Sequence, residues 1–203
     1  MIRYPNGNIF NSSLTPQKTT IKNEVNYGSR GMTLEYVINL ANEYYLNTNT
    51  AVIHKKPTPI NIVNVAYPNR AAAKITEAYF SKASTTDYNG IYQGYYLDFD
   101  AKETKNKTAL PLSNFHQHQI DHLNAILQQG GIGFILVRFI IQDEIYVYPA
   151  NQLITFWQAQ FNGGRKSIPY DNIKRIGYRV SYGINPTVPY LSAVKNLITA
   201  TNK

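Results

Sequence analysis

Acidic residues are unevenly distributed in this chain, and one group of them has the types and spacing that could do chemistry. Four of the twelve Asp and Glu residues fall between positions 87 and 103, in a protein with 20 Lys and Arg residues and a net charge of +8. The group consists of Asp87, Asp98, Asp100 and Glu103, with Lys102 just before the last. Because carboxylates crowd together at a cost unless a cation lies between them, this cluster is a candidate site for a hard divalent ion.

The alternating pattern around the cluster predicts two strands, over residues 86–92 and 95–103, separated by Gln93-Gly94. If these two residues form the whole turn, Tyr92 pairs with Tyr95 and Asp87 lies opposite Asp100. Directly opposed side chains share one face of a sheet, with Cβ atoms about 5 Å apart. The sequence therefore predicts that the two carboxylates meet.

The same register places Thr85 opposite Lys102, and it gives the second strand two unlike faces. Asp98, Asp100 and Lys102 lie on one face, and the opposite face carries Leu97, Phe99 and Ala101. Two interpretations remain open. The polar face is either a solvated surface with an ion pair to Lys102, or a site in which carboxylates hold a metal ion.

A metal ion here would be Mg²⁺, with Mn²⁺ as the alternative, because oxygen ligands suit both ions. Such an ion polarises a phosphodiester and lowers the pKa of a bound water. In this interpretation Asp87, Asp100 and Lys102 are the catalytic residues, and Lys102 stabilises the negative charge that develops on phosphorus.

A run of three histidines follows the cluster, in the segment "NFHQHQIDH". His118 and His122 have the spacing of a helical zinc pair, and His116 lies nearby, but a polar helix face is the favoured interpretation. Gln119 shares its side of the expected helix with Phe115 and with apolar residues. A buried amide needs a partner, and the acidic face could supply one.

Basic residues flank the cluster and favour a phosphate-rich partner. A net charge of +8 fits either nucleic acid or an anionic membrane surface, and charge alone does not separate them. Singly, each base is an ordinary surface residue; together they would draw a phosphate backbone toward a metal. The predicted DNA-binding residues are Arg30, Lys55, Lys56, Arg70, Lys105, Lys107, Arg165 and Lys166.

Length and composition limit the remaining possibilities. A chain of 203 residues favours one domain with a core, and the absence of cysteine excludes disulfides, thiolate zinc sites and a cysteine nucleophile. No run of about 18 apolar residues occurs, and the first 20 residues show no signal-peptide pattern, so we expect a cytoplasmic protein that is not a membrane protein.

The expected organisation is a flexible basic arm over residues 1–30 and a single domain over residues 31–203. Thr33 is expected to cap a helix, and "TAVIHKK" to form a strand. Residues 57–84 form an excursion from the main sheet, which begins as a strand in "INIVNV" and becomes helical through "RAAAKITEAYF".

The second half predicts the rest of an α/β fold. A helix over residues 114–129 is capped by Ser113 and ended by Gly130-Gly131. A buried strand over 132–141, a partner strand over 144–149 and a helix over 150–161 follow. The order of these elements predicts a mixed central sheet flanked by helices.

Several segments together resemble a known family. Asp87 and then Asp100-Ala101-Lys102 have the form of the PD-(D/E)XK nuclease motif, which alone is short. The chain is similar to the RecU Holliday junction resolvases over nearly its whole length, in the segments "MIRYPNG", "RGMTLE", "AVIHKKPTPI", "STTDYNGIY", "AKETKNKT", "NFHQHQI" and "GRKSI".

The resemblance implies a restriction-endonuclease-like core that works as a Mg²⁺-dependent homodimer on branched DNA, cutting four-way junctions. It implies metal ligands at Thr85, Asp87, Asp100 and Gln119 and a transition-state lysine at Lys102. The excursion over residues 57–84 corresponds to the family's stalk. A strand-exchange recombinase and a branch-migration motor are the protein partners that the resemblance implies.

One position departs from the expected family pattern, and it keeps a second function open. Asp100 stands where the family segment "DFEAKET" leads us to expect Glu, and the loss of one methylene shortens the reach by about 1.5 Å. The alternative is a protein that binds, anneals or bridges junctions with weak or no cleavage. A sequence-specific nuclease acting on linear duplex is a third possibility, which the stalk-like excursion disfavours.

Overall fold

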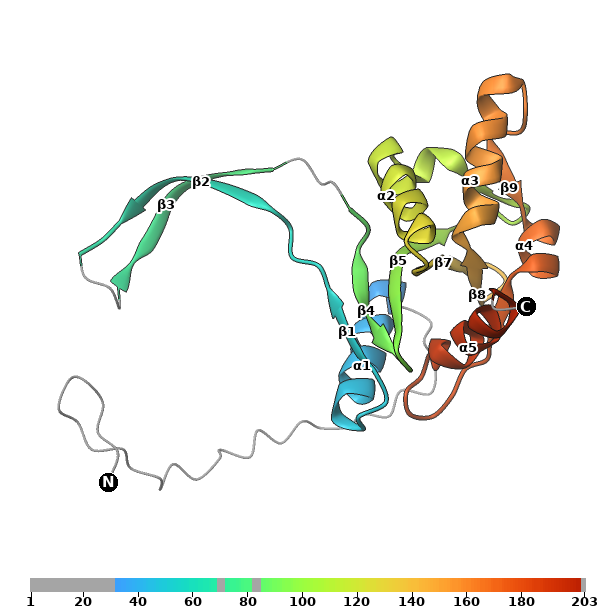
Figure 1. Cartoon of the computed structure of the whole chain (residues 1–203), viewed down its shortest axis with the longest axis horizontal. Coiled ribbons are helices and arrows are strands. Elements are labelled where there is room, and N and C mark those ends of the chain that lie inside the picture. Colours follow the sequence, from blue (N-terminus) through green and yellow to red (C-terminus); the bar gives the residue numbers. More distant parts are fainter. Residues whose placement is uncertain (1–31, 69–71, 82–84, 202–203) are drawn as a thin grey trace. The chain divides into compact units, whose positions relative to one another are not determined.

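The computed structural model describes residues 32–68, 72–81 and 85–201 (Figure 1). In chain order the elements are α1 (Leu34–Asn47), β1 (Val52–Lys55), β2 (Ile60–Ala66), β3 (Lys74–Phe80), β4 (Tyr88–Tyr92), β5 (Tyr95–Thr104), β6 (Ala109–Pro111), the 3₁₀ turn η2 (Leu112–Asn114), α2 (Gln117–Gln128), β7 (Ile132–Phe139), β8 (Glu144–Pro149), α3 (Ala150–Ala159), η3 (Gln160–Asn162), β9 (Ser167–Pro169), α4 (Tyr170–Ile176), β10 (Tyr178–Val180) and α5 (Tyr190–Thr201).

The main sheet has six strands in the order β1-β4-β5-β7-β8-β10. Strands β5 and β7 run parallel, and the other neighbours run antiparallel. A parallel pair needs a crossover connection, and the segment from β6 through α2 supplies it. The predicted mixed α/β sheet is therefore confirmed.

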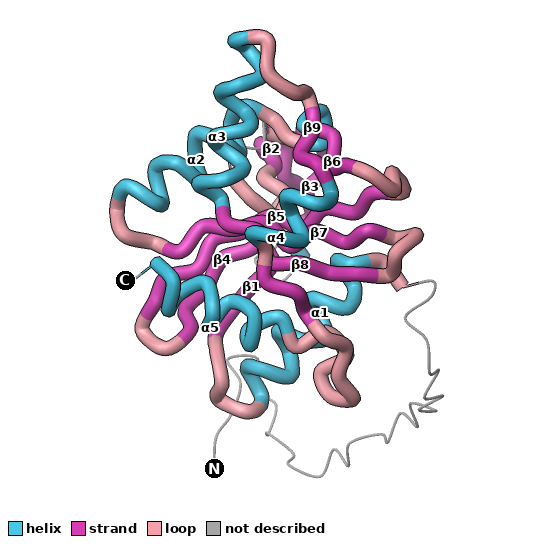
Figure 2. The backbone as a smooth tube through the Cα atoms, turned by 90° about the vertical axis from the view of Figure 1, so that its right-hand side faces the viewer, coloured by secondary structure: helices cyan, strands magenta, loops and turns pink. Residues whose placement is uncertain are grey.

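Helices cover both faces of this sheet (Figure 2). On one face α1 and α5 pack over a core that includes Leu97 and Phe99 of β5 and Phe134 of β7. On the other face α2, α3 and α4 pack over a second core that includes Ile135 and Val137 of β7. Because side chains alternate along a strand, β7 and β8 contribute to both cores, whereas β4 and β5 contribute apolar residues to the first core only.

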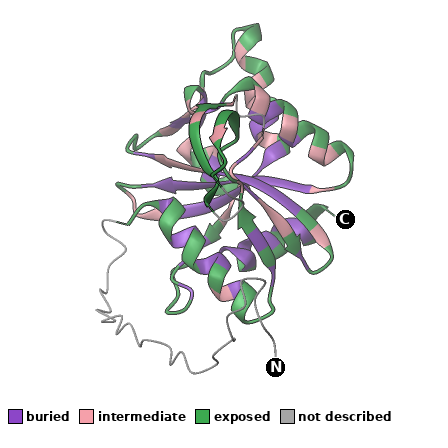
Figure 3. Cartoon of the chain, turned by 90° about the vertical axis from the view of Figure 1, so that its left-hand side faces the viewer, coloured by how far each residue is buried: buried purple, intermediate pink, exposed green. Residues whose placement is uncertain are grey.

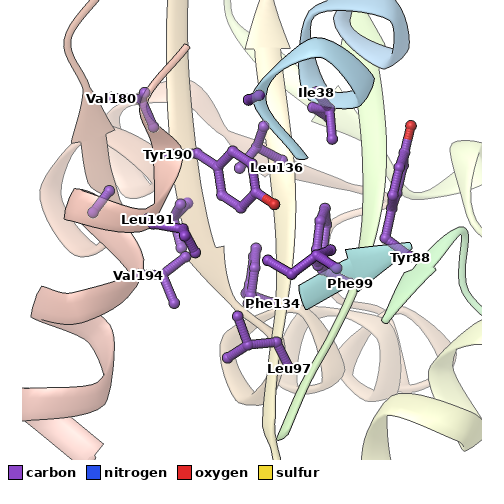
Figure 4. Packing of buried hydrophobic residues seen from close by; sticks show 14 of the residues in the cluster. Ile38, Tyr88, Leu97, Phe99, Phe134, Leu136, Val180, Tyr190, Leu191 and Val194 are labelled. Atoms are coloured by element: carbon purple, nitrogen blue, oxygen red, sulfur yellow. The ribbon is translucent and has the colours of Figure 1, made fainter. Parts of the chain in front are cut away.

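Aromatic rings form the centre of the first core (Figure 4). The ring of Phe99 stacks on Tyr88 with a centroid distance of 4.9 Å and on Phe134 at 4.6 Å, and Tyr190 of α5 tilts against it at 5.5 Å. All four side chains are fully buried. Phe99 thus joins strands β4, β5 and β7 to the helix that covers them.

Strands β2 and β3 pair only with each other, in a two-stranded sheet of their own. They occupy most of the segment between β1 and β4, where the sequence predicts an insertion over residues 57–84. Nearly all of their residues are exposed, including Ile60, Ile62, Tyr79 and Phe80, in contrast to the buried central strands (Figure 3). This hairpin therefore has no hydrophobic core of its own.

The turn that sets the predicted register is confirmed. Gln93 and Gly94 have φ values of 50° and 82°, as a two-residue type I′ turn requires, and Tyr92 pairs with Tyr95. The N-cap of α1 is confirmed as well, because the side chain of Thr33 accepts a hydrogen bond from Tyr36 N.

Two expectations about local structure were wrong. The stretch expected to be helical through residues 70–80 contains strand β3, because Ile75, Thr76, Tyr79 and Phe80 favour strands and pair with β2. Helix α2 begins at Gln117 rather than near Asn114, and His116 replaces Ser113 as its N-cap. Residues 112–114 form a separate 3₁₀ turn instead.

Some elements of the structure had no counterpart in the prediction from sequence, and one predicted segment lies outside the described residues. The short pair β6 and β9, helices α4 and α5 and strand β10 had no predicted counterpart. The predicted basic arm over residues 1–30 lies outside the described residues. None of the helices in the described ranges is long and apolar enough to cross a membrane.

The aromatic stack predicts where the fold is most sensitive to mutation. We expect Phe99→Ala to lower the free energy of unfolding by about 3–5 kcal/mol, because it removes a fully buried ring and leaves a cavity between β4 and β7. Denaturant unfolding followed by circular dichroism measures this. Phe161→Ala is the control, since that ring is 69% exposed and its loss should change the free energy of unfolding by less than about 0.5 kcal/mol. Equal effects would contradict the assignment.

Candidate active site

The polar face of β5 is not a solvated surface. Asp98 and Asp100 are both 0% exposed, and Lys102 keeps only 17% of its side chain exposed. Their neighbours on β7 are Gly133, Ile135 and Val137, so the charged residues continue a face that is apolar on the next strand. Helix α2 packs against both strands. The interpretation as a solvated sheet face is thus wrong.

Asp87 and Asp100 lie together, as the register predicted. The backbone N–H of Asp87 donates to Oδ1 of Asp100 at 3.1 Å, and Oδ2 of Asp87 accepts from the N–H of Ala101 at 3.3 Å. Each carboxylate therefore bonds to the backbone of the opposite segment. The side chains are held in place by these reciprocal bonds although Asp87 lies just before the start of β4.

The second oxygen of Asp100 has an unusual environment. Its Oδ2 is buried and lies 3.0 Å from Nζ of Lys102, but it accepts no hydrogen bond within the described part of the chain. The same ammonium lies 5.5 Å from the ring centre of Phe115, just ahead of α2. Lys102 is thus held between a carboxylate and an aromatic ring.

Burial controls the protonation of Asp100. Burial raises the pKa of its carboxyl group to about 7, the neighbouring Lys102 ammonium partly opposes this rise, and the Asp87 carboxylate adds to it. A carboxylate that is hard to ionise, with one oxygen lacking a hydrogen bond, would be stabilised by a nearby cation. This is a property expected of a metal ligand.

The other two predicted ligands take less direct positions. Thr85 is half-buried two residues before Asp87, and its Oγ1 donates to the carbonyl of Thr86. Gln119 is buried on α2, and its Oε1 accepts from the N–H of His116, which closes the first turn of the helix. Both oxygens retain a second lone pair, so neither bond excludes metal ligation.

No three Asp, Glu, His or Cys side chains converge as a metal site anywhere in the described ranges. His118 and His122, which have the spacing of a helical zinc pair, therefore form no zinc site with a third such side chain in the described ranges. His116 caps α2 and its ring stacks on that of His118 at 5.4 Å, while Nε2 of His122 lies 3.1 Å from Asp98. A metal at Asp87 and Asp100 would need further oxygen ligands from Thr85, Gln119, the backbone or water.

The described members of the predicted DNA-binding set lie on separate segments. Lys55 pairs with Glu35, and Lys56 pairs with Asp98. Lys105 and Lys107 are exposed before β6, whereas Arg165 and Lys166 are exposed before β9, and β6 and β9 run antiparallel. The two pairs thus lie at opposite ends of this ribbon. Arg30 and Arg70 lie outside the described residues.

A hollow of about 330 Å³ adjoins Asp87. Its lining residues are Glu35, Lys55, Lys56, Pro57, Thr58, Pro59, Thr85, Thr86 and Asp87. The part of this sheet face over β1 and β4 is open, with Val52 and Ile91 about half exposed. A polyanion could therefore reach Asp87 from the side of β4.

Sequence reasoning missed the contacts around Asp98. This carboxylate was counted in the acidic cluster, but its partners Lys56, Thr86, Tyr96 and His122 come from four different segments. The burial of Asp98 could have indicated that several side chains bond to it. The alternation of polar and apolar residues along the strand does not show whether its polar face is buried.

A mixed sheet that brings two acids and a lysine together on one face is consistent with the core of a PD-(D/E)XK-type nuclease. Comparison with known proteins then gives the family. The family described as "Recombination protein U" (RecU) matches residues 29–196. The chain belongs to the RecU family.

Curated relatives agree with this over nearly full length. The "Holliday junction resolvase RecU" of Levilactobacillus brevis is 55% identical over 199 residues, which is 98% of this chain and 99% of the relative. The protein of the same name from Leuconostoc mesenteroides is 56% identical over 204 residues, 98% of each chain. That of a Geobacillus species is 51% identical over 197 residues, 97% of this chain and 98% of the relative.

The raised pKa of Asp100 predicts a pH-dependent stability of the metal-free protein. The ordinary value is 3.8 and the folded value about 7, so between these values the unfolded chain has released a proton that the folded chain still holds. Unfolding then releases a proton, and rising pH from about 4 to 7 favours unfolding. We expect Asp100→Asn, which cannot ionise, to gain stability relative to the unmodified protein over this range, as measured by thermal unfolding in EDTA.

Asp171→Asn serves as the control for this measurement, because Asp171 is an exposed acid at the start of α4. The difference in melting temperature between Asp171→Asn and the unmodified protein should not change with pH over the same range. A level difference for Asp100→Asn as well would show that burial does not raise the pKa of Asp100.

Proposed function

We propose that this protein is an endonuclease that resolves four-way DNA junctions by metal-dependent hydrolysis of phosphodiesters. The observation that carries the proposal is the pairing of half-buried Asp87 with buried Asp100, whose Oδ2 lies beside the Lys102 ammonium and accepts no hydrogen bond from the described residues. Membership of the RecU family and the names of the relatives support the substrate class. Binding without cleavage is not favoured, because those relatives are named as resolvases.

The donor set fits a hard divalent ion. Asp87 and Asp100 would hold Mg²⁺, or Mn²⁺ as the alternative, with oxygens of Thr85 and Gln119 completing the set. The bound ion would supply a nucleophilic water at neutral pH and polarise the phosphate. With the shorter Asp100 in place of the Glu expected from the resemblance, the preferred ion could shift toward Mn²⁺.

The chain's own residues have separate tasks in this reaction. The backbone N–H groups of Asp87 and Ala101 fix the orientation of the two carboxylates. Lys102, held against Phe115, places a positive charge where the negative charge on phosphorus increases. Its weak exposure keeps that charge poorly hydrated, which strengthens the interaction.

Substrate choice depends on features outside this cluster. Phosphates would contact Lys55, Lys105, Lys107, Arg165 and Lys166, together with Arg30 and Arg70. The β2–β3 hairpin, the counterpart of the stalk, would select branched DNA. A homodimer would make paired cuts, and recombinase and branch-migration motor remain proposed partners. Because four-way DNA junctions are the proposed substrate, the cytoplasm is the proposed place of action.

The proposal is tested with a labelled four-way junction incubated with Mg²⁺, Mn²⁺ or EDTA, beside a linear duplex of the same sequence. We expect paired cuts in the junction that require metal and little cutting of the duplex. Tight junction binding without cuts in either metal would favour the architectural alternative, and efficient cutting of the duplex would favour a restriction-type nuclease.

Asp87→Asn should separate chemistry from binding. The substitution removes a metal ligand and one negative charge near phosphate, so we expect cleavage to fall below detection while junction affinity in EDTA stays the same or increases. Gel-shift and cleavage assays on the same junction measure the two effects. If binding were lost together with cleavage, Asp87 would not be a metal ligand of this kind.

A further inference from the structure

Asp98 is the most completely bonded carboxylate of the cluster, and the proposed reaction does not use it. Its Oδ2 lies 2.8 Å from Nζ of Lys56, 3.0 Å from the hydroxyl of Tyr96 and 3.1 Å from Nε2 of His122. Its Oδ1 accepts from the hydroxyl of Thr86. Nζ of Lys56 also donates to that hydroxyl at 2.9 Å, which closes a ring of three side chains.

This ring joins the two ends of the insertion. Lys56 directly follows β1, where the chain leaves the main sheet, and Thr86 lies where the chain returns just before β4. The backbone adds a fourth bond, from the N–H of Lys56 to the carbonyl of Asp87 at 2.8 Å. The two ends of the insertion are therefore hydrogen-bonded to the same buried carboxylate, that of Asp98.

The segment that carries Asp87 needs such support. Residues 85–87 precede β4 and make no ladder bonds of that strand. Asp87 is bonded by its N–H to Asp100 and by its carbonyl to Lys56, while its neighbour Thr86 is bonded to Asp98. Removing Asp98 would leave Lys56 with a poorly compensated charge and would release Thr86.

We infer that the ring of Asp98, Lys56 and Thr86 is a positioning device, which fixes Asp87 against Asp100 and couples the base of the β2–β3 hairpin to the metal ligands. The inference rests on the proposed function for its catalytic consequence. Lys56 is then a positioning residue rather than a contact for DNA phosphate, because its side chain is only 17% exposed and its ammonium is bonded to a fully buried acid.

The physical chemistry favours such a role. A buried carboxylate with three donors and an imidazole nitrogen in contact is well satisfied, and in a low-dielectric surrounding a network of this kind has a single preferred arrangement. Breaking one member leaves the others buried and unpaired, which costs more than a surface ion pair would. Residues that orient metal ligands typically change metal affinity or activity by about 10- to 100-fold when they are replaced.

The first experiment uses Asp98→Asn in the full chain. Calorimetric Mn²⁺ binding should weaken by about 10- to 100-fold, and kcat for junction cleavage should fall to a similar extent. Junction affinity in EDTA should be unchanged, because Asp98 is buried away from phosphate. Amide hydrogen exchange at Asp87, whose N–H bonds to Asp100, should become faster in the metal-free variant.

A matched pair at Thr86 keeps the test decisive if Asp98→Asn does not fold. Thr86→Val retains the shape but loses the hydroxyl, whereas Thr86→Ser retains the hydroxyl that donates to Asp98. We expect Thr86→Val to show weaker Mn²⁺ binding and faster exchange at Asp87, and Thr86→Ser to recover both. A purely structural role would leave Mn²⁺ affinity the same in the two variants.

Glu144→Gln is the control for loss of a largely buried, hydrogen-bonded acid elsewhere. Glu144 on β8 accepts from Tyr146 and Tyr170 and pairs with Arg179. Its replacement should lower the melting temperature without changing Mn²⁺ affinity or exchange at Asp87. An equal loss of Mn²⁺ affinity in this control would overturn the positioning role.

The outcomes separate this inference from the proposed function. Unchanged Mn²⁺ affinity, kcat and exchange in Asp98→Asn would overturn the inference while leaving the nuclease in place. If the unmodified protein neither bound Mn²⁺ nor cut junctions, the proposed function would fail, and exchange at Asp87 would still decide whether Asp98 fixes this segment.

Discussion

Burial of negative charge on strand β5 is the constraint on which the rest of this structure depends. Two carboxylates two residues apart lie fully inside the protein, where each must be neutralised or hydrogen-bonded. Asp98 is compensated by the protein itself through Lys56, Thr86, Tyr96 and His122. Asp100 is compensated only in part, by Lys102 and one backbone N–H. This difference separates an acid that is fully bonded within the protein from the proposed metal ligand.

The surrounding elements follow from that difference. The donors to Asp98 come from the end of β1, the start of β4, from β5 and from α2, so the main sheet, the insertion and the covering helix meet at one group. Asp100 contacts Asp87, which lines the hollow, and keeps an oxygen that accepts no hydrogen bond from the described residues. A fully bonded carboxylate, Asp98, thus lies next to one with unsatisfied bonding capacity, Asp100, on the same face of the strand.

Local pattern was sufficient to predict the register and much of the fold. Alternation along β5 and the Gln93-Gly94 turn correctly placed Asp87 next to Asp100, because both depend on neighbours in sequence. The helix predicted through residues 70–80 was wrong. The prediction followed the alanines of this stretch, whereas its β-branched and aromatic residues form a strand that pairs with β2. The partners of Asp98 were not predictable, because Lys56 and His122 approach it from positions 42 and 24 residues away in the chain.

The two-residue turn between β4 and β5 limits the insertions and deletions that this part of the chain can tolerate. Side chains alternate with a period of two, so a single inserted residue that shifted the pairing would exchange the faces of one strand relative to the other. Asp98 and Asp100 would then be directed at Phe134 and Tyr190, and Leu97 and Phe99 would lie under α2. Substitutions in this turn can be tolerated, whereas a change of its length by one codon would remove the active site and the core together.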